Sequence, residues 1–512
     1  MNVGSLVGRH SRYRGGHPAL VCGETRLTWS ELDAKVNRLA NAFLALGLRK
    51  GDKIAVVMPN CLEVLETYWA AIQMGLVLVP LSPLLRGPAL AALLRDSDAV
   101  AVVLGDGMAS EIDGIRGDVP AIAAERFIKL GGSRRAAYQD YETLVTAQSD
   151  QAPPAVTIEN DDLFNIVYSS GTTGTPKGII HTHHIRAMYC ALFASTWRMT
   201  PESVVMHAGS LVFNGAFVTL MPALFLGTTY VLQARFDATE FIETVQREQV
   251  THVMMVPSQI LAVMNAANFE PHKLRSLQML GSVGAPLHRE HKDRLTAALP
   301  GIFYELYGLT EGVITILDRD EVSRKPGSVG GPQPFFELRI AGENGADLPA
   351  GEVGEIVGRS PLLMPGYYKR PDLTTEAIRD GWMFTGDMGY LDDDGYLYLV
   401  DRKKDLIISG GVNVYPKDIE EVVVTHPDVL EAAVFGIPNE KWGEAPMGAV
   451  VLKNGAGVDA VTLRQWVNER VGARYQQLCG VVILDEFPRN AAGKTLKRLM
   501  RDEYWKDRAV RI

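Results

Sequence analysis

Short apolar runs alternate with helical patterns along the chain up to about residue 325. The runs KIAVVMPN (53–60) and LFNIVY (163–168) are rich in β-branched and aromatic residues, as buried strands are. Between such runs, apolar residues recur at helical spacing, as in LTWSELDAKVNRLANAFLALGL (27–48), where Ser30 and Asp33 predict a capping box. Buried strands joined by helices form parallel sheets. The alternation therefore predicts an α/β fold with largely parallel strands.

The pattern changes after about residue 325. Short strands punctuated by Gly and Pro, such as ELRIAG and GYLYLVDR, predict a β-rich subdomain. A charged run, DRKKD (401–405), then precedes a fresh alternation of strands and helices that lasts about a hundred residues, a typical size for a small domain. A chain of 512 residues is also too long for one compact core. We predict a large domain at 1–402 and a small α+β domain at 403–512.

Composition excludes several classes of protein. The chain has 60 acidic and 51 basic residues, so it has no general positive field to attract nucleic acid. Its four cysteines are far apart and form no CxxC pair, which indicates neither a zinc site nor a disulfide framework. The longest apolar tract, AFVTLMPALFLG (216–227), is short and contains Pro222. We expect a cytoplasmic protein without a transmembrane segment.

The stretch YSSGTTGTPKG (168–178) is the strongest local sign of function. Gly lets the backbone approach a ligand closely, Ser and Thr add hydroxyl donors, and Lys177 adds a positive charge. A Walker A loop has Gly before its Lys and Ser or Thr after it, whereas Pro176 precedes Lys177 and Gly178 follows it. The alternative is a surface loop of low complexity, but a predicted buried strand leads directly into this stretch. We interpret it as a phosphate loop of another kind.

Five further motifs follow this loop in a fixed order. They are YGLTEG (307–312), GEVGEI (351–356), WMFTGD (382–387), DRKKDLIISGGVNVYPKDIE (401–420) and PRNAAGKTLKR (488–498). Together the six motifs resemble those of the adenylate-forming superfamily, which comprises acyl-CoA synthetases, adenylation domains and beetle luciferases. Within it, the chain is most similar to bacterial fatty-acid or aryl-acid CoA ligases. The resemblance covers about Trp29 to Arg498.

The resemblance implies a reaction in two steps with ATP, Mg²⁺ and coenzyme A. A carboxylic acid attacks the α-phosphate of ATP to give an acyl adenylate and pyrophosphate, and a thiol then displaces AMP. It also implies two α/β subdomains beside the β-rich subdomain, and a mobile C-terminal domain that turns about a hinge at Lys404.

The resemblance assigns a role to each matching residue. The phosphates of ATP fall to Ser170, Gly171, Thr172, Thr173, Gly174 and Lys177. Adenine and ribose fall to Gly284, Ala285, Pro286, Tyr307, Asp387 and Arg402. The catalytic residues are Lys494, which reaches the α-phosphate, Thr310, and Glu311, which also binds the metal. The thiol channel includes Gly410 and Gly411.

The acyl pocket carried over from the family is mainly apolar and shows no fixed charge. Its members are Phe213, Asn214, Phe217, Val256, Gly281, Gly308 and Val313. Activators of amino acids place an Asp where this chain has Asn214, and a buried ammonium without a partner costs several kcal/mol. We therefore expect a fatty or aromatic acid.

Three positions depart from the family pattern. Phe213 stands where many acyl-CoA synthetases have His, Glu305 where Gln or Asn is usual, and Val412 where an acid is common. The stretch HTHH (181–184) has no acidic or Cys partner at ligand spacing, so packing or the surface is favoured over a metal site.

Three classes of function stay open at this point. The first is an acid–CoA ligase, the second an adenylation enzyme that loads a carrier protein, and the third a nucleotide-binding module without catalysis. The presence of Lys494 in its family setting disfavours the third. Small-molecule acid, ATP and CoA are the expected partners, and a homodimer stays open as the oligomeric state.

Overall fold

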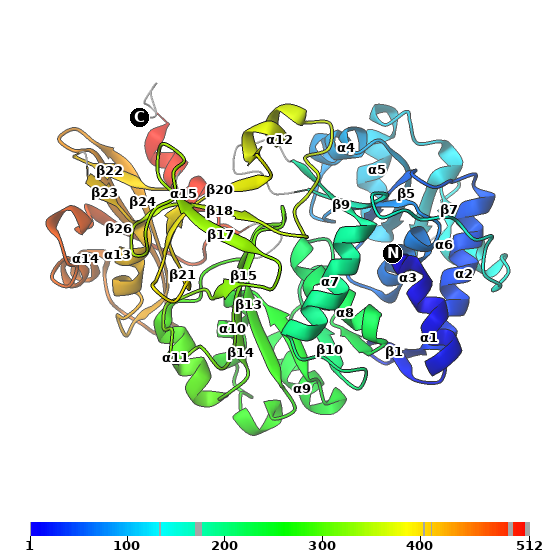
Figure 1. Ribbon diagram of the computed structural model, residues 1–512, viewed down its shortest axis with the longest axis horizontal. Coiled ribbons are helices and arrows are strands. Elements are labelled where there is room, and N and C mark those ends of the chain that lie inside the picture. The colour runs from blue at the N-terminus through cyan, green and yellow to red at the C-terminus, as the bar shows by residue number, and fades with distance from the viewer. Residues whose placement is uncertain are drawn as a thin grey trace. The chain divides into compact units, whose positions relative to one another are not determined.

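The computed structural model describes residues 2–132, 135–168, 177–402, 405–410, 412–489 and 495–506. The chain divides into two compact units (Figure 1). Unit 1 contains Met1–Val283, Leu309–Val313 and Ser360–Glu376. Unit 2 contains Gly284–Gly308, Ile314–Arg359 and Ala377–Ile512.

A seven-stranded sheet forms one half of unit 1. Its order is β7-β6-β5-β3-β4-β8-β9, and all its neighbours are parallel except β8 and β9. The strands are β3 (Lys53–Val57), β4 (Val77–Pro80), β5 (Ala99–Gly105), β6 (Phe127–Leu130), β7 (Gln139–Asp140), β8 (Leu163–Tyr168) and β9 (Gly178–Thr182). The parallel arrangement confirms the prediction from the alternating pattern.

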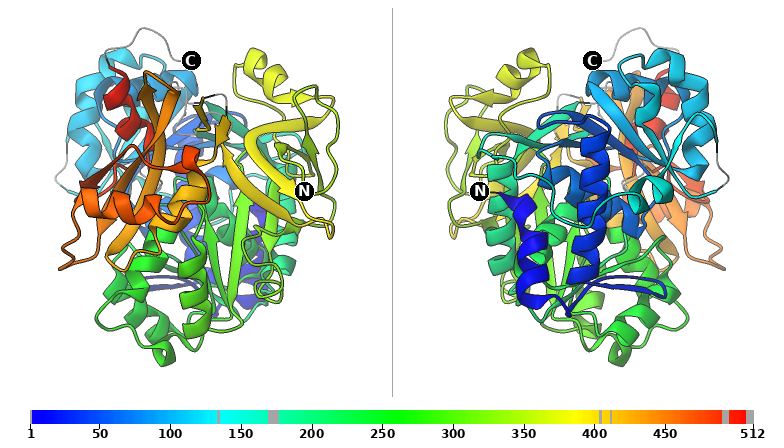
Figure 2. Two further views of the ribbon diagram at one scale, coloured as in Figure 1. Left: turned by 90° about the vertical axis from the view of Figure 1, so that its left-hand side faces the viewer. Right: turned by 90° about the vertical axis from the view of Figure 1, so that its right-hand side faces the viewer.

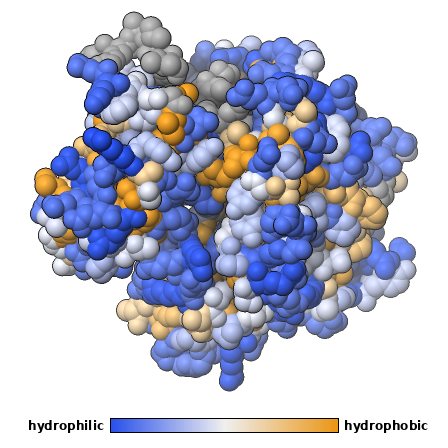
Figure 3. All heavy atoms as spheres, turned by 60° about the vertical axis from the view of Figure 1, so that its left-hand side comes forward, coloured by the Kyte–Doolittle hydropathy of each residue, from blue (hydrophilic) through white to orange (hydrophobic). Residues whose placement is uncertain are grey.

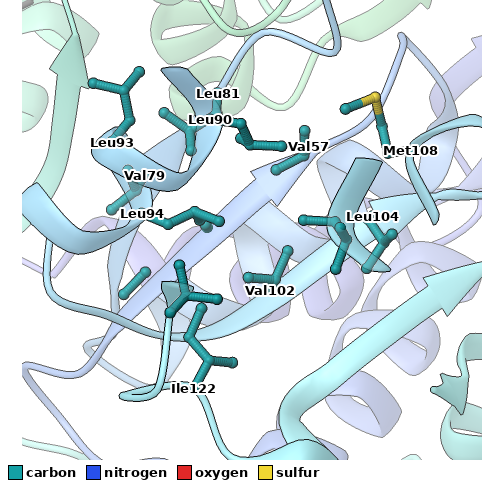
Figure 4. Close-up of a cluster of buried hydrophobic side chains, with 14 of the residues drawn as sticks. Val57, Val79, Leu81, Leu90, Leu93, Leu94, Val102, Leu104, Met108 and Ile122 are labelled. Carbon is teal, nitrogen blue, oxygen red and sulfur yellow. The ribbon is translucent and has the colours of Figure 1, made fainter. Parts of the chain in front are cut away.

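Side chains from this sheet and from two helices form a buried apolar cluster (Figure 4). Val57, Val79 and Val102 come from the strands, and Leu90 and Leu94 come from α4 (Gly87–Asp96). Helix α5 (Ala109–Ile115) contributes Ile112 and Ile115. Burial of each Val, Leu or Ile side chain contributes about 1.5–3 kcal/mol, so this cluster is a main source of stability for the sheet.

Six strands of a second sheet also lie in unit 1, in the order β13-β12-β10-β11-β1-β2. They are β1 (Pro18–Cys22), β2 (Thr25–Thr28), β10 (Val204–His207), β11 (Thr229–Leu232), β12 (His252–Met255) and β13 (Met279–Val283). Only β1 and β2 pair antiparallel among these six. The accompanying helices are α1 (Leu6–Arg14), α2 (Trp29–Ala45), α3 (Leu62–Gln73), α6 (Tyr141–Thr146), α7 (His183–Thr196), α8 (Asn214–Leu226), α9 (Ala238–Glu248) and α10 (Pro257–Met264). Helices α1 and α2 pack side by side, as the right-hand view of Figure 2 shows in dark blue.

The capping box of α2 lies two residues before the predicted one. The Thr28 side chain accepts a hydrogen bond from the Glu31 backbone N–H, and the Glu31 carboxylate accepts from the Thr28 backbone N–H at 2.8 Å. Ser30 is already inside the helix, so the prediction of a box at Ser30 and Asp33 was wrong. Both pairs have the required spacing, and β2, which ends at Thr28, decides where the helix begins.

Unit 2 is rich in strands, as predicted for the chain after about residue 325, and apart from β25 with β26 its described strand pairs are antiparallel. A five-stranded sheet has the order β17-β18-β20-β19 with β21 paired to β20, and a second has the order β23-β22-β25-β24 with β26 paired to β25. The strands of unit 2 are β14 (Phe303–Gly308), β15 (Ile314–Leu317), β16 (Gly331–Pro332), β17 (Glu337–Ala341), β18 (Gly354–Arg359), β19 (Ile378–Arg379), β20 (Trp382–Leu391), β21 (Leu397–Arg402), β22 (Ile407–Ser409), β23 (Val412–Val414), β24 (Val429–Asn439), β25 (Gly443–Leu452) and β26 (Gly480–Leu484). Its helices are α11 (Arg289–Ala298), α13 (Pro416–Val423), α14 (Ala460–Asn468) and α15 (Lys497–Asp502), whereas α12 (Pro371–Ala377) ends at the boundary between the units. The division at 402/403 stays a prediction.

The face drawn in Figure 3 is mainly hydrophilic, with apolar residues in small groups. In the described part of the chain, no helix is both long enough and apolar enough to cross a bilayer.

Glu305 has a partner that accounts for its burial. Its carboxylate on β14 forms an ion pair with the Lys292 ammonium group on α11, and both residues are buried. A buried charge is tolerated when it is paired, so the pair explains how an acid can stand where the family usually has an amide.

We expect Lys292→Met to lower the thermal unfolding midpoint of the protein, because it leaves the Glu305 carboxylate buried without its cation. Breaking a buried pair by removing one partner costs about 3–5 kcal/mol. The double variant Lys292→Met/Glu305→Gln is the matched control, and it should recover most of the loss. Calorimetry on the three proteins checks this expectation, which equal midpoints for the single and double variants would contradict.

Candidate active site

The predicted phosphate loop is anchored at both ends in one sheet. Strand β8 ends at Tyr168, β9 begins at Gly178, and these two residues are partners in the antiparallel ladder. Ser170, Gly171, Thr172, Thr173 and Gly174 lie outside the described residues. Lys177, directly before β9, is described.

One tyrosine ring connects the loop lysine to the predicted metal-binding acid. Lys177 Nζ lies over the ring of Tyr367, 4.9 Å from its centroid. The Tyr367 hydroxyl donates to Glu311 Oε1 at 2.8 Å. Burial and the Glu311 carboxylate raise the pKa of Tyr367, so the hydroxyl keeps its proton and stays a donor. Tyr367 therefore contacts both Lys177, which is predicted to bind the phosphates, and Glu311, which is predicted to bind their metal.

The backbone around Tyr367 joins three segments of unit 1. Tyr368 N–H donates to Gly178 C=O at 2.7 Å, and Met364 N–H donates to Glu311 C=O at 2.9 Å. Gly312 has φ +113°, and a Cβ there would lie 2.2 Å from the Leu362 carbonyl oxygen, so only glycine fits. The segment 360–368 thus holds the turn at 309–313 against β9. Sequence reasoning missed Tyr367, because no motif that we recognised contains it.

The HTHH stretch contributes a buried histidine rather than a surface patch. His181 and His183 are both fully buried, and His181 Nε2 donates to the Thr310 carbonyl oxygen at 2.9 Å. Burial and the nearby Arg186 guanidinium lower the pKa of His181 well below its usual value, so the ring is neutral. No group of three or more potential metal-ligating side chains occurs among the described residues.

The predicted acyl wall is spread over several elements. Within unit 1, Phe213 is the N-cap of α8, Asn214 and Phe217 lie on α8, Val256 is the N-cap of α10, Gly281 lies on β13, and Val313 is buried in the turn at 309–313. Gly308 ends β14 in unit 2. A Cβ at Gly281 would lie 2.6 Å from the Met254 side chain, so methionine fills the space beside this glycine.

A buried cation lies beside two residues of the predicted acyl wall. Arg186 Nη2 donates to Asn214 Oδ1 at 2.9 Å, and the Arg186 guanidinium lies 4.2 Å from the centroid of the Phe217 ring. Arg186 on α7 is fully buried. A cation therefore lies directly behind two residues of the predicted wall, and no sequence motif indicated it.

The predicted adenosine residues of unit 2 form a second cluster. Tyr307 on β14 donates its hydroxyl proton to Asp387 Oδ2 at 2.8 Å, and Arg402 Nε lies 3.5 Å from Asp387 Oδ1. Asp387 and Arg402 are register partners on β20 and β21, which fixes their distance. Each carboxylate oxygen can accept two hydrogen bonds, so Asp387 keeps the capacity to accept from ribose hydroxyls.

Strand β20 is irregular just before Asp387, and a glycine lies there. Gly386 has φ +72°, and its N–H donates to Glu355 Oε1 at 3.0 Å. The GEVGEI and WMFTGD motifs thus meet at one hydrogen bond.

The remaining predicted site residues lie elsewhere in unit 2. Gly284, Ala285 and Pro286 precede α11, and Gly284 has φ +90°. Gly410 directly follows β22 with φ +61°, and a Cβ there would lie 2.7 Å from the Trp442 ring. Val412, the third departure, is exposed at the start of β23, where no charged partner is required. Lys404, Gly411 and Lys494 lie outside the described residues.

Comparison with known proteins gives the same family as the motifs. The family model for AMP-binding enzymes matches residues 8–368, and the model for the C-terminal domain of AMP-binding enzymes matches residues 418–494. The chain belongs to the AMP-binding enzyme family. This confirms the resemblance to the adenylate-forming superfamily and the fold that it implied.

Relatives of this AMP-binding enzyme cover nearly its whole length. It is 35% identical over 509 residues to a feruloyl-CoA synthase of Amycolatopsis sp, covering 98% of this chain and 99% of that protein. It is 34% identical over 485 residues to the long-chain-fatty-acid–CoA ligase FadD13 of Mycobacterium tuberculosis, covering 94% of each. ATP-bound MatB from Rhodopseudomonas palustris has a similar structure, with a TM-score of 0.89, 30% identity and 99% of each chain covered. The prediction of an AMP-forming acid–thiol ligase is confirmed at this level.

Proposed function

We propose that this enzyme joins a fatty or aromatic carboxylic acid to coenzyme A through an acyl adenylate. The observation that carries the proposal is the Tyr367 bridge, which holds Lys177 and Glu311 on one ring at the edge of the phosphate loop. Adenylation brings the negatively charged substrate carboxylate close to the phosphates of ATP. It therefore needs a cation beside the phosphates, here Lys177, and a protein carboxylate that can bind their metal ion, here Glu311.

The residues of unit 1 suit the phosphates and their metal. Glu311 and Thr310 offer carboxylate and hydroxyl oxygens, which are the ligands that a hard cation prefers, and Tyr367 orients the Glu311 carboxylate. Mg²⁺ bound there would neutralise charge on the phosphates during transfer. Lys177 would donate to a phosphate oxygen in the same region.

The residues of unit 2 suit adenosine. Asp387, oriented by Tyr307 and Arg402, would accept hydrogen bonds from the ribose hydroxyls.

The proposed reaction has two steps. The substrate carboxylate oxygen displaces pyrophosphate from the α-phosphate in the first step. In the second, the CoA sulfur attacks the acyl carbon, AMP leaves, and the thiol proton is released.

The relatives support the acid and its acceptor. A feruloyl-CoA synthase and a long-chain fatty-acid CoA ligase, both at about a third identity, are aryl and alkyl examples of the proposed reaction. Asn214 in place of an acid, with a guanidinium behind it, disfavours a substrate ammonium group.

We expect the purified protein to convert ATP, CoA and at least one acid into acyl-CoA, AMP and pyrophosphate in equal amounts. A panel of phenylpropenoic, benzoic, medium-chain and long-chain acids, with Mg²⁺ and analysis by mass spectrometry, checks this. Lys177→Met should lower the rate by roughly 10²-fold, because it removes a donor to the phosphates. Lys273→Met is the matched control, since Lys273 pairs with Glu270 and its loss should leave the rate unchanged.

Two results would overturn the proposal. In the first, the enzyme releases pyrophosphate and forms an acyl adenylate, but a carrier protein consumes this adenylate and CoA never does. The other is no pyrophosphate release with any acid in the panel.

A further inference from the structure

Arg186 is a buried cation without a carboxylate partner among the described residues. Its side chain is fully buried, and Nη1 has no hydrogen-bond partner in the part of the chain that the structure describes. Burial lowers the pKa of Arg186 to about 10, so the guanidinium is still charged at neutral pH. Burying a charge in this way is costly. Hydrogen bonds and aromatic rings surround this charge in place of a carboxylate.

The guanidinium links three elements of unit 1. Nε donates to Asn165 Oδ1 on β8 at 3.0 Å, and Nη2 donates both to His181 Nδ1 on β9 at 3.2 Å and to Asn214 Oδ1 on α8 at 2.9 Å. The rings of Tyr189 and Phe217 lie 4.6 Å and 4.2 Å from it, in the range of cation–π contacts. Asn214 Nδ2 in turn donates to the Tyr189 hydroxyl at 3.1 Å, so both ends of the Asn214 amide are engaged.

The partners of His181 fix the position of its proton. A guanidinium can only donate, so Nδ1 must be the acceptor. The Thr310 carbonyl oxygen, 2.9 Å from Nε2, can only accept, so Nε2 carries the proton. A neutral His181 thus connects Arg186 to the backbone of Thr310.

One chain of hydrogen bonds therefore runs from the predicted acyl wall to the predicted phosphate site. It begins at Asn214, passes through Arg186 and His181, and ends at Thr310, the residue before Glu311. We propose that Arg186 and His181 are positioning residues, which hold the turn at 309–313 in register with Asn214 so that acid and phosphates meet in one geometry. This inference rests on the function proposed above.

Two amide substitutions at His181 separate the two ends of the link. Gln places an N–H donor near the position of Nε2, so His181→Gln keeps the bond to Thr310. Asn is shorter, so His181→Asn keeps an acceptor for Arg186 but does not reach Thr310. A role in packing alone would make the two variants alike.

The first readout is hydrogen exchange of the ligand-free protein, measured by mass spectrometry on peptides that contain 309–313. The turn is closed by Gly312 N–H to Leu309 C=O at 3.0 Å, and by Leu309 N–H to Val313 C=O at 3.0 Å. We expect His181→Asn to speed exchange of these amides at least tenfold, and His181→Gln to leave it within about threefold of wild type. Equal rates of amide exchange at 309–313 in both variants would contradict the inference.

The second readout is the adenylation half reaction. His181→Asn should lower kcat for pyrophosphate release by roughly 10- to 100-fold, since a misplacement of about 1 Å costs about that much. His181→Gln keeps the bond to Thr310 but loses the bond to Arg186, so it should lower kcat by a smaller factor. Arg186→Met, which keeps an unbranched apolar chain, removes the same end of the link as His181→Gln, so it should lower kcat to a similar extent, and it replaces that variant if His181→Gln does not fold. Full kcat in Arg186→Met would also overturn the inference. Wild-type protein that releases no pyrophosphate with any acid would instead refute the function.

Discussion

Lys494→Ala is expected to reduce pyrophosphate release by roughly 10²- to 10³-fold, while conversion of supplied acyl adenylate to acyl-CoA stays within a few-fold of wild type. The family assigns this lysine to the α-phosphate and carboxylate oxygens, where negative charge meets in the adenylation step. The thiol step forms no new bond to phosphorus, so it does not need the same cation. Both half reactions are measured separately, the second with synthetic adenylate.

The described neighbours of Lys494 make a general role of the basic tail less plausible. Lys497 Nζ lies 2.5 Å from Glu420 Oε1, and Arg501 Nη1 lies 3.8 Å from Asp405 Oδ1, so these charges have partners within unit 2. Lys506→Ala is the matched control, because Lys506 is exposed and pairs only weakly with Glu503 at 3.7 Å. Equal loss of both half reactions in a folded Lys494→Ala protein would contradict the assignment.

Lys404→Pro is expected to have the opposite effect, with adenylation retained and thioester formation reduced by at least tenfold. The family turns its small domain about this position between the two steps, and proline fixes φ and stiffens the backbone. Lys404→Ala removes the same side chain without restricting φ, so it is the matched control and should support both steps. Stopped-flow measurement of adenylate formation and of its consumption by CoA separates the two effects.

Contacts across the predicted hinge show what such a rotation must break. Lys417 on α13 donates from Nζ to the Leu399 carbonyl oxygen at 2.7 Å, and its backbone N–H donates to Asp401 Oδ2 at 3.3 Å. His288 Nδ1 lies 3.0 Å from Glu421 Oε1. A turn about Lys404 would have to exchange these contacts for others or for water.

Gly411→Leu should resemble Lys404→Pro, because a large side chain there would obstruct the predicted thiol channel. Its neighbour Gly410 already has φ +61° and no room for a Cβ beside Trp442. If Lys404→Pro and Gly411→Leu leave thioester formation unchanged, the rotation does not apply to this chain.

Much of this protein could be predicted from local patterns. Strand and helix alternation predicted the parallel sheets, because side-chain periodicity belongs to each segment and survives in any tertiary context. The six motifs predicted the family, and Tyr307, Asp387 and Arg402 do come together, since two of them are register partners on adjacent strands. The start of α2 shows the limit of local rules, as two candidate caps had suitable spacing and the end of β2 chose between them.

What the sequence could not show is which polar groups meet across elements. Arg186, His181 and Asn214 come from α7, β9 and α8 and share no spacing that a motif would record. The same is true of Tyr367 with Lys177 and Glu311, and of Lys292 with Glu305. The sequence by itself determined the elements, their order and the chemistry of the motifs, because these depend on residues close together in the chain. Only the tertiary structure decided the partners of the buried charges, because a charge removed from water must be matched by whatever group the folded backbone brings within a few ångströms.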